Sequence, residues 1–207
     1  DRDALRRARR RIDLSVFRCD DAQVFAELAR ATARGVQVSV LMTARAKGRP
    51  GDLETLRAAL GATGAAVHLY TNPSMKYHAK YIVVDEGPAI VGSGNFTSKC
   101  FERTLDAMVL THDPEVVAGL RALHAADCQG APLPSALSPR LVVAPERSRG
   151  VLAALIANAE SSVRIIDSKL CDPRMMSLLS ARRNDGLTVE IFDGPRIGAL
   201  ESHGKML

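Results

Sequence analysis

Four side chains with catalytic or anion-binding chemistry stand in two short clusters of the segment "HAKYIVVDEGPAIVGSGN". His78 and Lys80 lie two residues apart, and so do Ser93 and Asn95. Residues two apart on a strand point to the same face of a sheet. The turn sequence "EGP" predicts a hairpin about Gly87, with position 80 near 94 and position 78 near 96. The four side chains would then gather at one end of that hairpin.

This combination of side chains suits a phosphodiester. A lysine ammonium supplies positive charge, and asparagine and serine donate hydrogen bonds to non-bridging oxygens. Histidine can act near neutral pH as a nucleophile or as a proton donor. Asp85 and Gly92 complete the string His-x-Lys-x4-Asp-x6-Gly-Ser-x-Asn, whose six identities at fixed spacing make a chance occurrence very improbable. We expect neither a metal nor a cofactor, because lysines would neutralise the phosphate charge; that no Asp or His cluster with metal-ligand spacing stands beside the string agrees with this.

A second His-x-Lys pair, His203 and Lys205, stands near the other end of the chain. The same order of patterns precedes both pairs: helix, strand, Cys-Asp, helix, glycine, strand. Cys19-Asp20 corresponds to Cys171-Asp172, and Gly35 to Gly186 with one residue of slippage. These correspondences indicate an internal duplication in which the second copy lacks an insertion. The Asp and the Gly-Ser-x-Asn of the second copy are expected after Leu207.

Helical and strand patterns alternate along the chain. Helices are predicted at 3–11, 21–35, 53–64 and 113–128, strands at 12–17, 36–42, 65–70, 80–85 and 89–93, and a loop at 44–52. Alternation of this kind predicts an α/β layered sheet covered on both faces. The histidines outside the two pairs, His68, His112 and His124, have no such neighbours and are interpreted as structural.

The chain is basic, with a formal net charge of +5 and a pI of about 9.3. A basic surface favours anionic partners such as nucleic acid, acidic lipid headgroups or phosphorylated small molecules. Six arginines occur in the first eleven residues, where Leu5, Ala8 and Ile12 at helical spacing predict an amphipathic helix with a charged outer face. Aromatic residues are only 4% and Trp is absent, so no base-stacking platform or interfacial anchor stands out.

The cysteines and the ends of the chain bear on its compartment. None of Cys19, Cys100, Cys128 and Cys171 forms a Cys-x-x-Cys pair, so we expect small buried residues rather than a zinc site or a disulfide framework. No apolar run approaches the ~20 residues of a spanning helix. Because the chain starts at Asp1 rather than Met, any signal or anchor upstream would be missing from this sequence. The localisation therefore stays open, with membrane association and export among the alternatives.

The string "HAKYIVVDEGPAIVGSGN" resembles the HKD motif of the phospholipase D superfamily. The repeated lead-ins resemble the two halves of a two-motif member, with a first half at 1–128, a proline-containing linker at 129–139 and a second half at 140–207. The resemblance implies an α/β fold of two phospholipase D-like halves, each a β-sheet flanked by helices. It also implies a pseudo-two-fold axis between the halves, with the active site at their interface.

The resemblance assigns roles to the motif residues. One histidine forms a phosphohistidine and the other is the general acid and base; His78 is favoured as the nucleophile and His203 as the acid/base. Lys80, Lys205 and Asn95 would bind the phosphate, Ser93 would support the site, and Asp85 and Gly92 would serve structure. Family members also carry a downstream carboxylate that hydrogen-bonds the motif histidine, for which Asp106 is favoured over Glu102.

Three functions follow from the resemblance. The first is a phospholipase D or cardiolipin-synthase-like enzyme, a hydrolase or transphosphatidylase acting on phospholipid headgroups, with peripheral membrane contact. The second is a nuclease of the same superfamily, with nucleic acid as the partner, which the serine of "GSGN" also suits. The third is a catalytically weak phosphate- or membrane-binding module. Two motifs in one chain resemble the lipid enzymes, so the first is favoured; the oligomeric state stays open.

Overall fold

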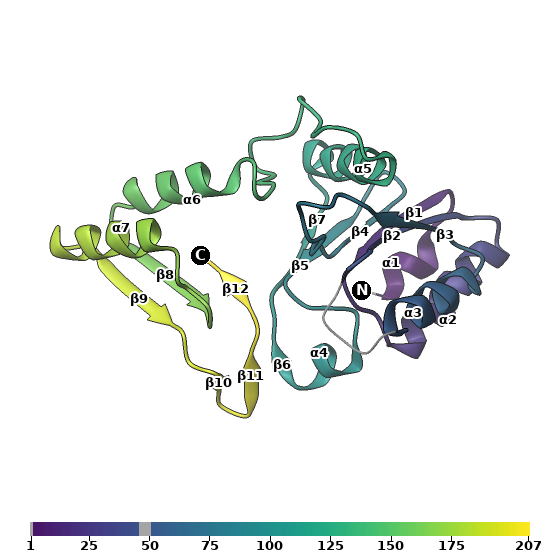
Figure 1. The fold of residues 1–207 in the computed structure, drawn as a ribbon, viewed down its shortest axis with the longest axis horizontal. Coiled ribbons are helices and arrows are strands. Elements are labelled where there is room, and N and C mark those ends of the chain that lie inside the picture. The colour runs from purple at the N-terminus through teal and green to yellow at the C-terminus, as the bar shows by residue number, and fades with distance from the viewer. Residues whose placement is uncertain (1, 46–50) are drawn as a thin grey trace. The chain divides into compact units, whose positions relative to one another are not determined.

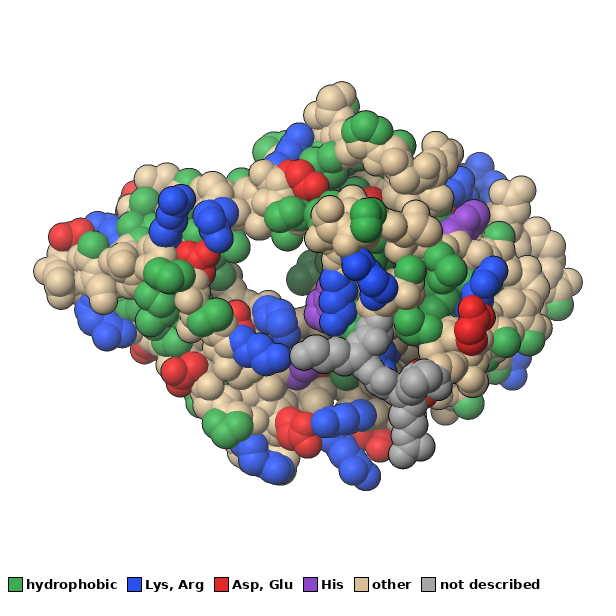
Figure 2. Space-filling view, in the orientation of Figure 1, with side chains coloured by type: hydrophobic (Ala, Val, Ile, Leu, Met, Phe, Trp, Pro, Cys, Tyr) green, Lys and Arg blue, Asp and Glu red, His purple; other side chains and the backbone are tan. Residues whose placement is uncertain are grey.

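The chain forms two compact units, each with its own sheet and helices (Figure 1). The computed structural model describes residues 2–45 and 51–207, so most of the loop predicted at 44–52 lies outside the described residues. Unit 1 comprises Asp1–Glu102 and Met108–Ser138, and unit 2 comprises Arg103–Ala107 and Pro139–Leu207. On the face drawn in Figure 2, Lys and Arg side chains occur on both units among acidic and apolar ones.

A mixed six-stranded sheet in the order β3-β2-β1-β4-β5-β7 forms the centre of unit 1. β1, β2 and β3 run parallel, whereas β4 pairs antiparallel with β1, β5 with β4, and β7 with β5. The bounds are β1 (Arg11–Val16), β2 (Gln37–Thr43), β3 (Ala66–Tyr70), β4 (Tyr81–Val84), β5 (Ala89–Gly92) and β7 (Met108–Thr111). The parallel strands require crossover helices, and these are the helices that the sequence predicts between them.

Helices cover both faces of this sheet (Figure 1). The helices of unit 1 are α1 (Arg2–Arg7), α2 (Ala22–Ala33), α3 (Asp52–Gly61), the short α4 (Ser98–Glu102) and α5 (Pro114–Gln129). Apolar residues of α1, α2 and α3 pack with alternate strand residues such as Ile12, Leu14 and Val16 in one core. The residues between these, Asp13 and Ser15, lie on the face that α5 covers.

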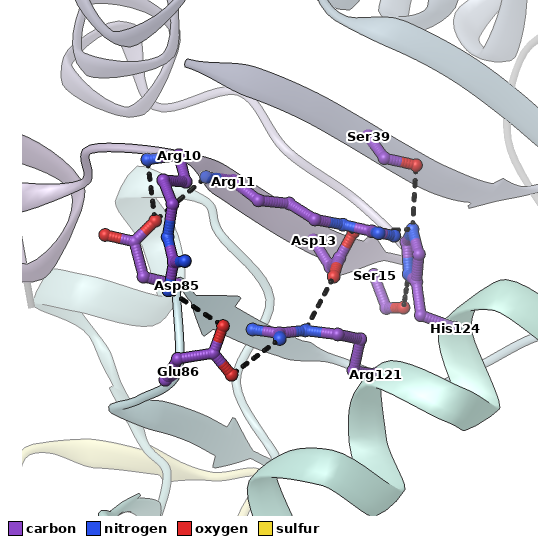
Figure 3. A network of polar contacts seen from close by, with 9 residues as sticks. All are labelled: Arg10, Arg11, Asp13, Ser15, Ser39, Asp85, Glu86, Arg121 and His124. Carbon is purple, nitrogen blue, oxygen red and sulfur yellow. Dashed lines mark hydrogen bonds and ion pairs between the residues drawn. The ribbon is translucent and has the colours of Figure 1, made fainter.

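The face under α5 is a buried polar layer (Figure 3). Asp13 is fully buried, and its carboxylate accepts a 2.7 Å hydrogen bond from Arg11 and lies 3.7 Å from the Arg121 guanidinium. His124, also fully buried, lies between the hydroxyls of Ser15 at 3.3 Å and Ser39 at 3.0 Å. Burial lowers the pKa of His124 to about 4, against the opposing effect of the Asp13 carboxylate. His124 is therefore a neutral structural group at pH 7.

Unit 2 is built on a three-stranded sheet in the order β12-β8-β9 and a second one in the order β10-β11-β6. Helices α6 (Ser148–Ala157) and α7 (Pro173–Asn184) pack on the first sheet around Ile156, Val163 and Leu179. The strand bounds are β6 (Thr104–Leu105), β8 (Ser162–Asp167), β9 (Thr188–Phe192), β10 (Arg196–Ile197), β11 (Leu200–Ser202) and β12 (Lys205–Met206). The chain thus contributes β6 to unit 2 before it completes unit 1.

Unit 2 repeats part of unit 1 with a constant offset of 151 residues. In the parallel pair β1–β2, Arg11 lies opposite Gln37, and in β8–β9, Ser162 lies opposite Thr188. The helices between them have 12 residues each and begin after an aspartate N-cap, Asp21 or Asp172. Both are followed by a positive-φ glycine, Gly35 at 85° and Gly186 at 94°. The duplication predicted from sequence is thus present, but the equivalent of Asp172 is Asp21, not Asp20.

Some predicted elements and environments differ from the structure. The first helix ends at Arg7 rather than Arg11, because the backbone N–H groups of Arg9 to Arg11 bind the carboxylate of Asp85 instead of continuing the helix. Ile12 lies in β1, as the strand predicted at 12–17 requires. Among the cysteines only Cys19 is buried, while Cys171 is exposed just before the N-cap of α7. All four cysteines are free thiols.

The segment predicted as a linker, 129–139, lies almost wholly in unit 1. Leu137 and Ser138 are buried there, and the Ser138 hydroxyl donates to the Glu115 carboxylate over 3.3 Å. Unit 2 resumes at Pro139. Over the described residues, no helix combines the length and the apolar character needed to cross a membrane.

Candidate active site

The predicted hairpin forms, with a register two residues away from the prediction. Tyr81 of β4 lies opposite Val91 of β5, and the Gly92 N–H donates to the Lys80 carbonyl over 3.1 Å. Position 80 therefore pairs with 92, not with 94. The error arises because the ladder continues to Val84 and Pro88, so that the loop is centred on Glu86 rather than Gly87. A shift of two residues leaves every side chain on its predicted face.

Asp85 fastens the hairpin turn to the start of β1 (Figure 3). Its carboxylate accepts hydrogen bonds from the backbone N–H groups of Arg9, Arg10 and Arg11 over 2.9, 2.8 and 2.8 Å. Burial raises the pKa of Asp85, but these three N–H groups outweigh burial and hold the pKa below its usual range. The positive φ of 44° at Asp85 lets the side chain turn back toward them. This geometry is that of a structural residue.

His78 and Lys80 lie on the irregular segment that leads into β4, and both contact Phe17 at the end of β1. The His78 ring is exposed and its centroid lies 4.5 Å from that of Phe17. Lys80 is only 4% exposed, and its ammonium donates to the His78 carbonyl over 2.7 Å and lies 3.2 Å from His78 Nδ1. The ammonium of Lys80 is thus held directly beside the imidazole of His78.

The "GSGN" segment follows β5 and leads back to the same end of β1. The Phe96 N–H donates to the Arg18 carbonyl over 3.2 Å, and the Phe96 carbonyl accepts from the Asp20 N–H over 3.1 Å. These bonds anchor the loop that carries Ser93 and Asn95. The side-chain oxygen of Asn95 is buried without a hydrogen-bond partner among the described residues. A buried acceptor oxygen in this state is suited to a ligand group that donates a hydrogen bond, since a buried polar atom is costly to leave unpaired.

His203 is positioned by a parallel ladder within unit 2. Ser202 of β11 lies opposite Leu105 of β6, and the His203 N–H donates to the Leu105 carbonyl over 3.2 Å. The next residues on the two segments, His203 and Asp106, join through a 2.7 Å hydrogen bond from Nδ1 to Oδ1. Asp106 also accepts from the Thr104 hydroxyl over 2.6 Å. An ionised carboxylate can only accept, so Nδ1 carries the proton and Nε2 is left for a substrate.

The carboxylate beside a motif histidine is therefore Asp106, and its partner is His203. The competing Glu102 lies at the end of α4 in unit 1. Gly204, next to His203, passes close to β6, where an added Cβ would lie 3.3 Å from the Leu105 carbonyl oxygen. A glycine at this position lets the His-x-Lys segment approach β6 closely enough for the Asp106 bond.

The two His-x-Lys pairs share one local geometry. The Lys205 ammonium donates to the His203 carbonyl over 2.7 Å, as the Lys80 ammonium does to the His78 carbonyl. Ser15 lies opposite Tyr81 in β1–β4, and Ile166 lies opposite Met206 in β8–β12. Tyr81 and Met206 each follow a motif lysine directly. The two pairs therefore occupy equivalent positions of the duplicated sheet.

Three residues of this region were not predicted from the sequence: Phe17, Arg45 and Lys76. Phe17 is 7% exposed and faces the motif side chains. Arg45 Nη2 donates to the carbonyls of Asn72, Pro73 and Met75 over 3.0, 2.6 and 2.9 Å. Lys76 had one signal in the sequence, its spacing of two from His78, which continues the alternation of the motif.

Comparison with known proteins assigns the family. The family model described as "Cardiolipin synthase, PLD-like domain" matches residues 2–127, more than half of the chain. The chain belongs to the phospholipase D superfamily. Cardiolipin synthase A of Pseudomonas aeruginosa (strain PAO1) is 32% identical over 107 residues, which cover 52% of this chain and 22% of the relative. Cardiolipin synthase A of Pseudomonas putida (strain W619) is 28% identical over 130 residues, 62% of this chain and 27% of the relative.

Solved structures with a similar fold agree with the observed architecture. Polyphosphate kinase from Porphyromonas gingivalis matches 97% of the chain with 37% of its own length, at a TM-score of 0.71 and 18% identity. Phosphatidylserine synthase from Haemophilus influenzae matches 92% of the chain with 57% of its length, at 0.64 and 15%. The phospholipase D family member Nuc from Salmonella typhimurium matches 61% of the chain with 82% of its length, at 0.53 and 20%. At these identities the likeness concerns the fold, and the chain spans about a quarter of its curated relatives.

Proposed function

We propose that this chain is part of a metal-independent phosphodiesterase or phosphatidyltransferase that acts on phospholipid headgroups through a phosphohistidine. The observation that carries the proposal is the repeated half-site, in which each lysine ammonium is bonded to the carbonyl of its histidine at an equivalent sheet position. Two such half-sites, related by a pseudo-two-fold axis, would bring two histidines and two lysines to one phosphate. The lysines then supply the positive charge that the transition state requires.

The reaction proceeds in two displacements. An imidazole nitrogen of His78 attacks phosphorus, the bond from phosphorus to the leaving oxygen breaks, and His203 Nε2–H gives its proton to that oxygen. Water or a second alcohol then gives its proton to His203 and attacks phosphorus, which breaks the N–P bond and restores His78. The assignment of His203 to proton transfer is supported by its Asp106 partner, which offsets the charge of the protonated ring.

The remaining motif residues would hold the substrate phosphate. Lys80, Lys205 and Asn95 donate to non-bridging oxygens, and Ser93 supports the loop that carries Asn95. The lipid assignment is supported by the family model and by relatives named cardiolipin synthase A. Lipid headgroups would also place the active protein in peripheral contact with a membrane.

The test uses the full-length protein in EDTA, with vesicles of phosphatidylglycerol or phosphatidylcholine and, separately, with single-stranded DNA. Headgroup release is expected. DNA nicking without headgroup release would instead establish the nuclease alternative, and binding without turnover the binding module.

A chromogenic phosphodiester tests the nucleophile directly. His78→Ala is expected to abolish its hydrolysis, because no other group would form the covalent intermediate. His112→Ala removes an exposed histidine outside the motif and is the matched control, with activity like that of the wild type. Turnover in His78→Ala at the wild-type rate would refute the assignment.

A further inference from the structure

Three positively charged side chains lie close to the ring of Phe17. The ammonium of Lys76 lies 4.6 Å from the ring centroid, that of Lys80 lies 5.2 Å away, and the guanidinium carbon of Arg18 lies 5.6 Å away. The His78 imidazole packs on the same ring at 4.5 Å. The face of an aromatic ring attracts cations, so Phe17 holds several of them near the motif histidine.

Lys76 joins His78 and Lys80 on one side of their segment. The residue between Lys76 and His78 is Tyr77, which is 7% exposed and whose hydroxyl lies 2.7 Å from Ser15 Oγ in the buried layer under α5. Side chains of the segment therefore alternate in direction: Tyr77 points into the buried layer, whereas its neighbours on either side face Phe17. In the structure, Lys76 therefore extends the motif of this half-site to Lys-x-His-x-Lys.

The backbone that carries Lys76 is fixed on both sides. The Arg45 guanidinium donates to the Met75 carbonyl over 2.9 Å as well as to two earlier carbonyls of the segment. Tyr77 is buried on the other side. Lys76 itself is exposed, so its ammonium can reach a ligand from an ordered backbone position.

The positive charge at this half-site exceeds the negative charge of a simple phosphodiester. A phosphodiester carries one negative charge, which the motif lysines already neutralise. Like charges gathered around one ring repel each other, and an anion placed among them relieves the repulsion. We propose that Lys76 is a further anion-binding residue that selects substrates carrying a second anionic group beside the scissile phosphodiester. This inference rests on the proposed function.

The test compares Lys76→Gln with the wild-type full-length protein on matched substrates. Phosphatidylglycerol phosphate and phosphatidylglycerol differ by one terminal phosphate, and a dinucleotide with or without a 5′-phosphate gives the same contrast in the nucleic-acid arm. The preference in kcat/KM for the doubly anionic member is expected to fall roughly tenfold in Lys76→Gln, mainly through KM. Lys76→Arg should retain the preference. The arm that shows it identifies the source of the second anion.

Arg57→Gln is the matched control, because it removes one positive charge from the exposed face of α3. It should leave the preference unchanged. An equal fall in Arg57→Gln, or an unchanged preference in Lys76→Gln, would overturn the inference.

A binding measurement separates this inference from the proposed function. Calorimetric titration of the wild type with inorganic pyrophosphate and with phosphate should show tighter binding of pyrophosphate, and Lys76→Gln should abolish the difference. Phe17→Leu, with folding checked by its unfolding temperature, should reduce it too. If the wild type turns over no substrate, the proposed function fails while this titration still decides the role of Lys76. Equal pyrophosphate affinity in wild type and Lys76→Gln would exclude it.

Discussion

A hydrogen bond to a carboxylate defines the state of His203 at the residue scale. His203 Nδ1–H donates a hydrogen bond to the 7% exposed carboxylate of Asp106. His78 instead packs on an aromatic ring with an ammonium beside it. A carboxylate partner suits a ring that gains and loses a proton during turnover, because it offsets the charge of the protonated ring. The Asp106 contact therefore supports the proposed role of His203 as the acid and base.

Asp106→Asn tests that division of roles. With a p-nitrophenyl phosphodiester the leaving group needs little acid help, so the first displacement should stay fast. The second displacement, which needs His203 as base, should slow about 100-fold. Rapid-mixing kinetics should then show a burst of about one p-nitrophenolate per site. A uniform slowing without a burst would argue that Asp106 serves both displacements alike.

Chemistry-bearing residues could be predicted from sequence where they belong to a fixed string. His78, Lys80, Asn95 and the second pair were predicted in this way. Phe17 and Lys76 were not predicted. Their contact forms because β1 ends beside the segment that leads into β4, and no local sequence pattern indicates that these two segments are neighbours. The assignment of Asp106 to His203 likewise needed the β6–β11 ladder.

At the scale of elements, periodicity identified most of the sheet and helices of unit 1. It could not reveal β6 or β11, which have two and three residues and no repeat to detect. The β4–β5 register was missed by two residues because the centre of a hairpin depends on backbone geometry at Asp85 and Gly87, both with positive φ. The α2 and α7 boundaries were clearer, because an aspartate N-cap and a glycine frame each helix.

The buried layer between α5 and the sheet makes unit 1 sensitive to acid. The pKa of His124 is about 4 in the folded protein, below the 6.5 of a free histidine, so the unfolded state binds more protons between these values. The stability that neutral His124 contributes is complete above pH 6.5 and is lost as the pH falls toward 4. The loss should be roughly 3 kcal/mol in the free energy of unfolding.

His124→Gln isolates this effect, because glutamine can bond Ser15 and Ser39 but does not titrate. All three tyrosines lie in unit 1 and the chain has no Trp, so tyrosine fluorescence during urea unfolding reports on this unit. The wild type should lose stability relative to His124→Gln between pH 6.5 and 4. Other titrating groups, such as Asp85, act in both proteins and cancel in the difference. Parallel pH profiles would exclude the buried neutral histidine.

At the scale of the whole molecule, the chain contains the same strand–helix–strand arrangement twice. The offset is 151 residues for β1-α2-β2 against β8-α7-β9, and 125 residues for the His-x-Lys pairs. The difference corresponds to the region of α3 and β3, which unit 2 lacks among its elements. A duplicated half-site in one chain gives that chain both histidines of the proposed reaction. One polypeptide could thus supply what separate copies of a single-motif protein would have to combine.

Mixing two inactive variants tests whether both histidines act within one chain. Full-length His78→Ala and His203→Ala each lack one histidine, so a site built inside one chain stays inactive in every mixture. If instead each site combined His78 of one copy with His203 of another, half of the randomly formed dimers would be mixed and one of their two sites intact. The mixture would then recover about a quarter of wild-type activity. We expect no recovery after co-refolding of equal amounts, measured with the chromogenic phosphodiester. Recovery near a quarter would replace the pseudo-two-fold site within a chain by a site shared between copies.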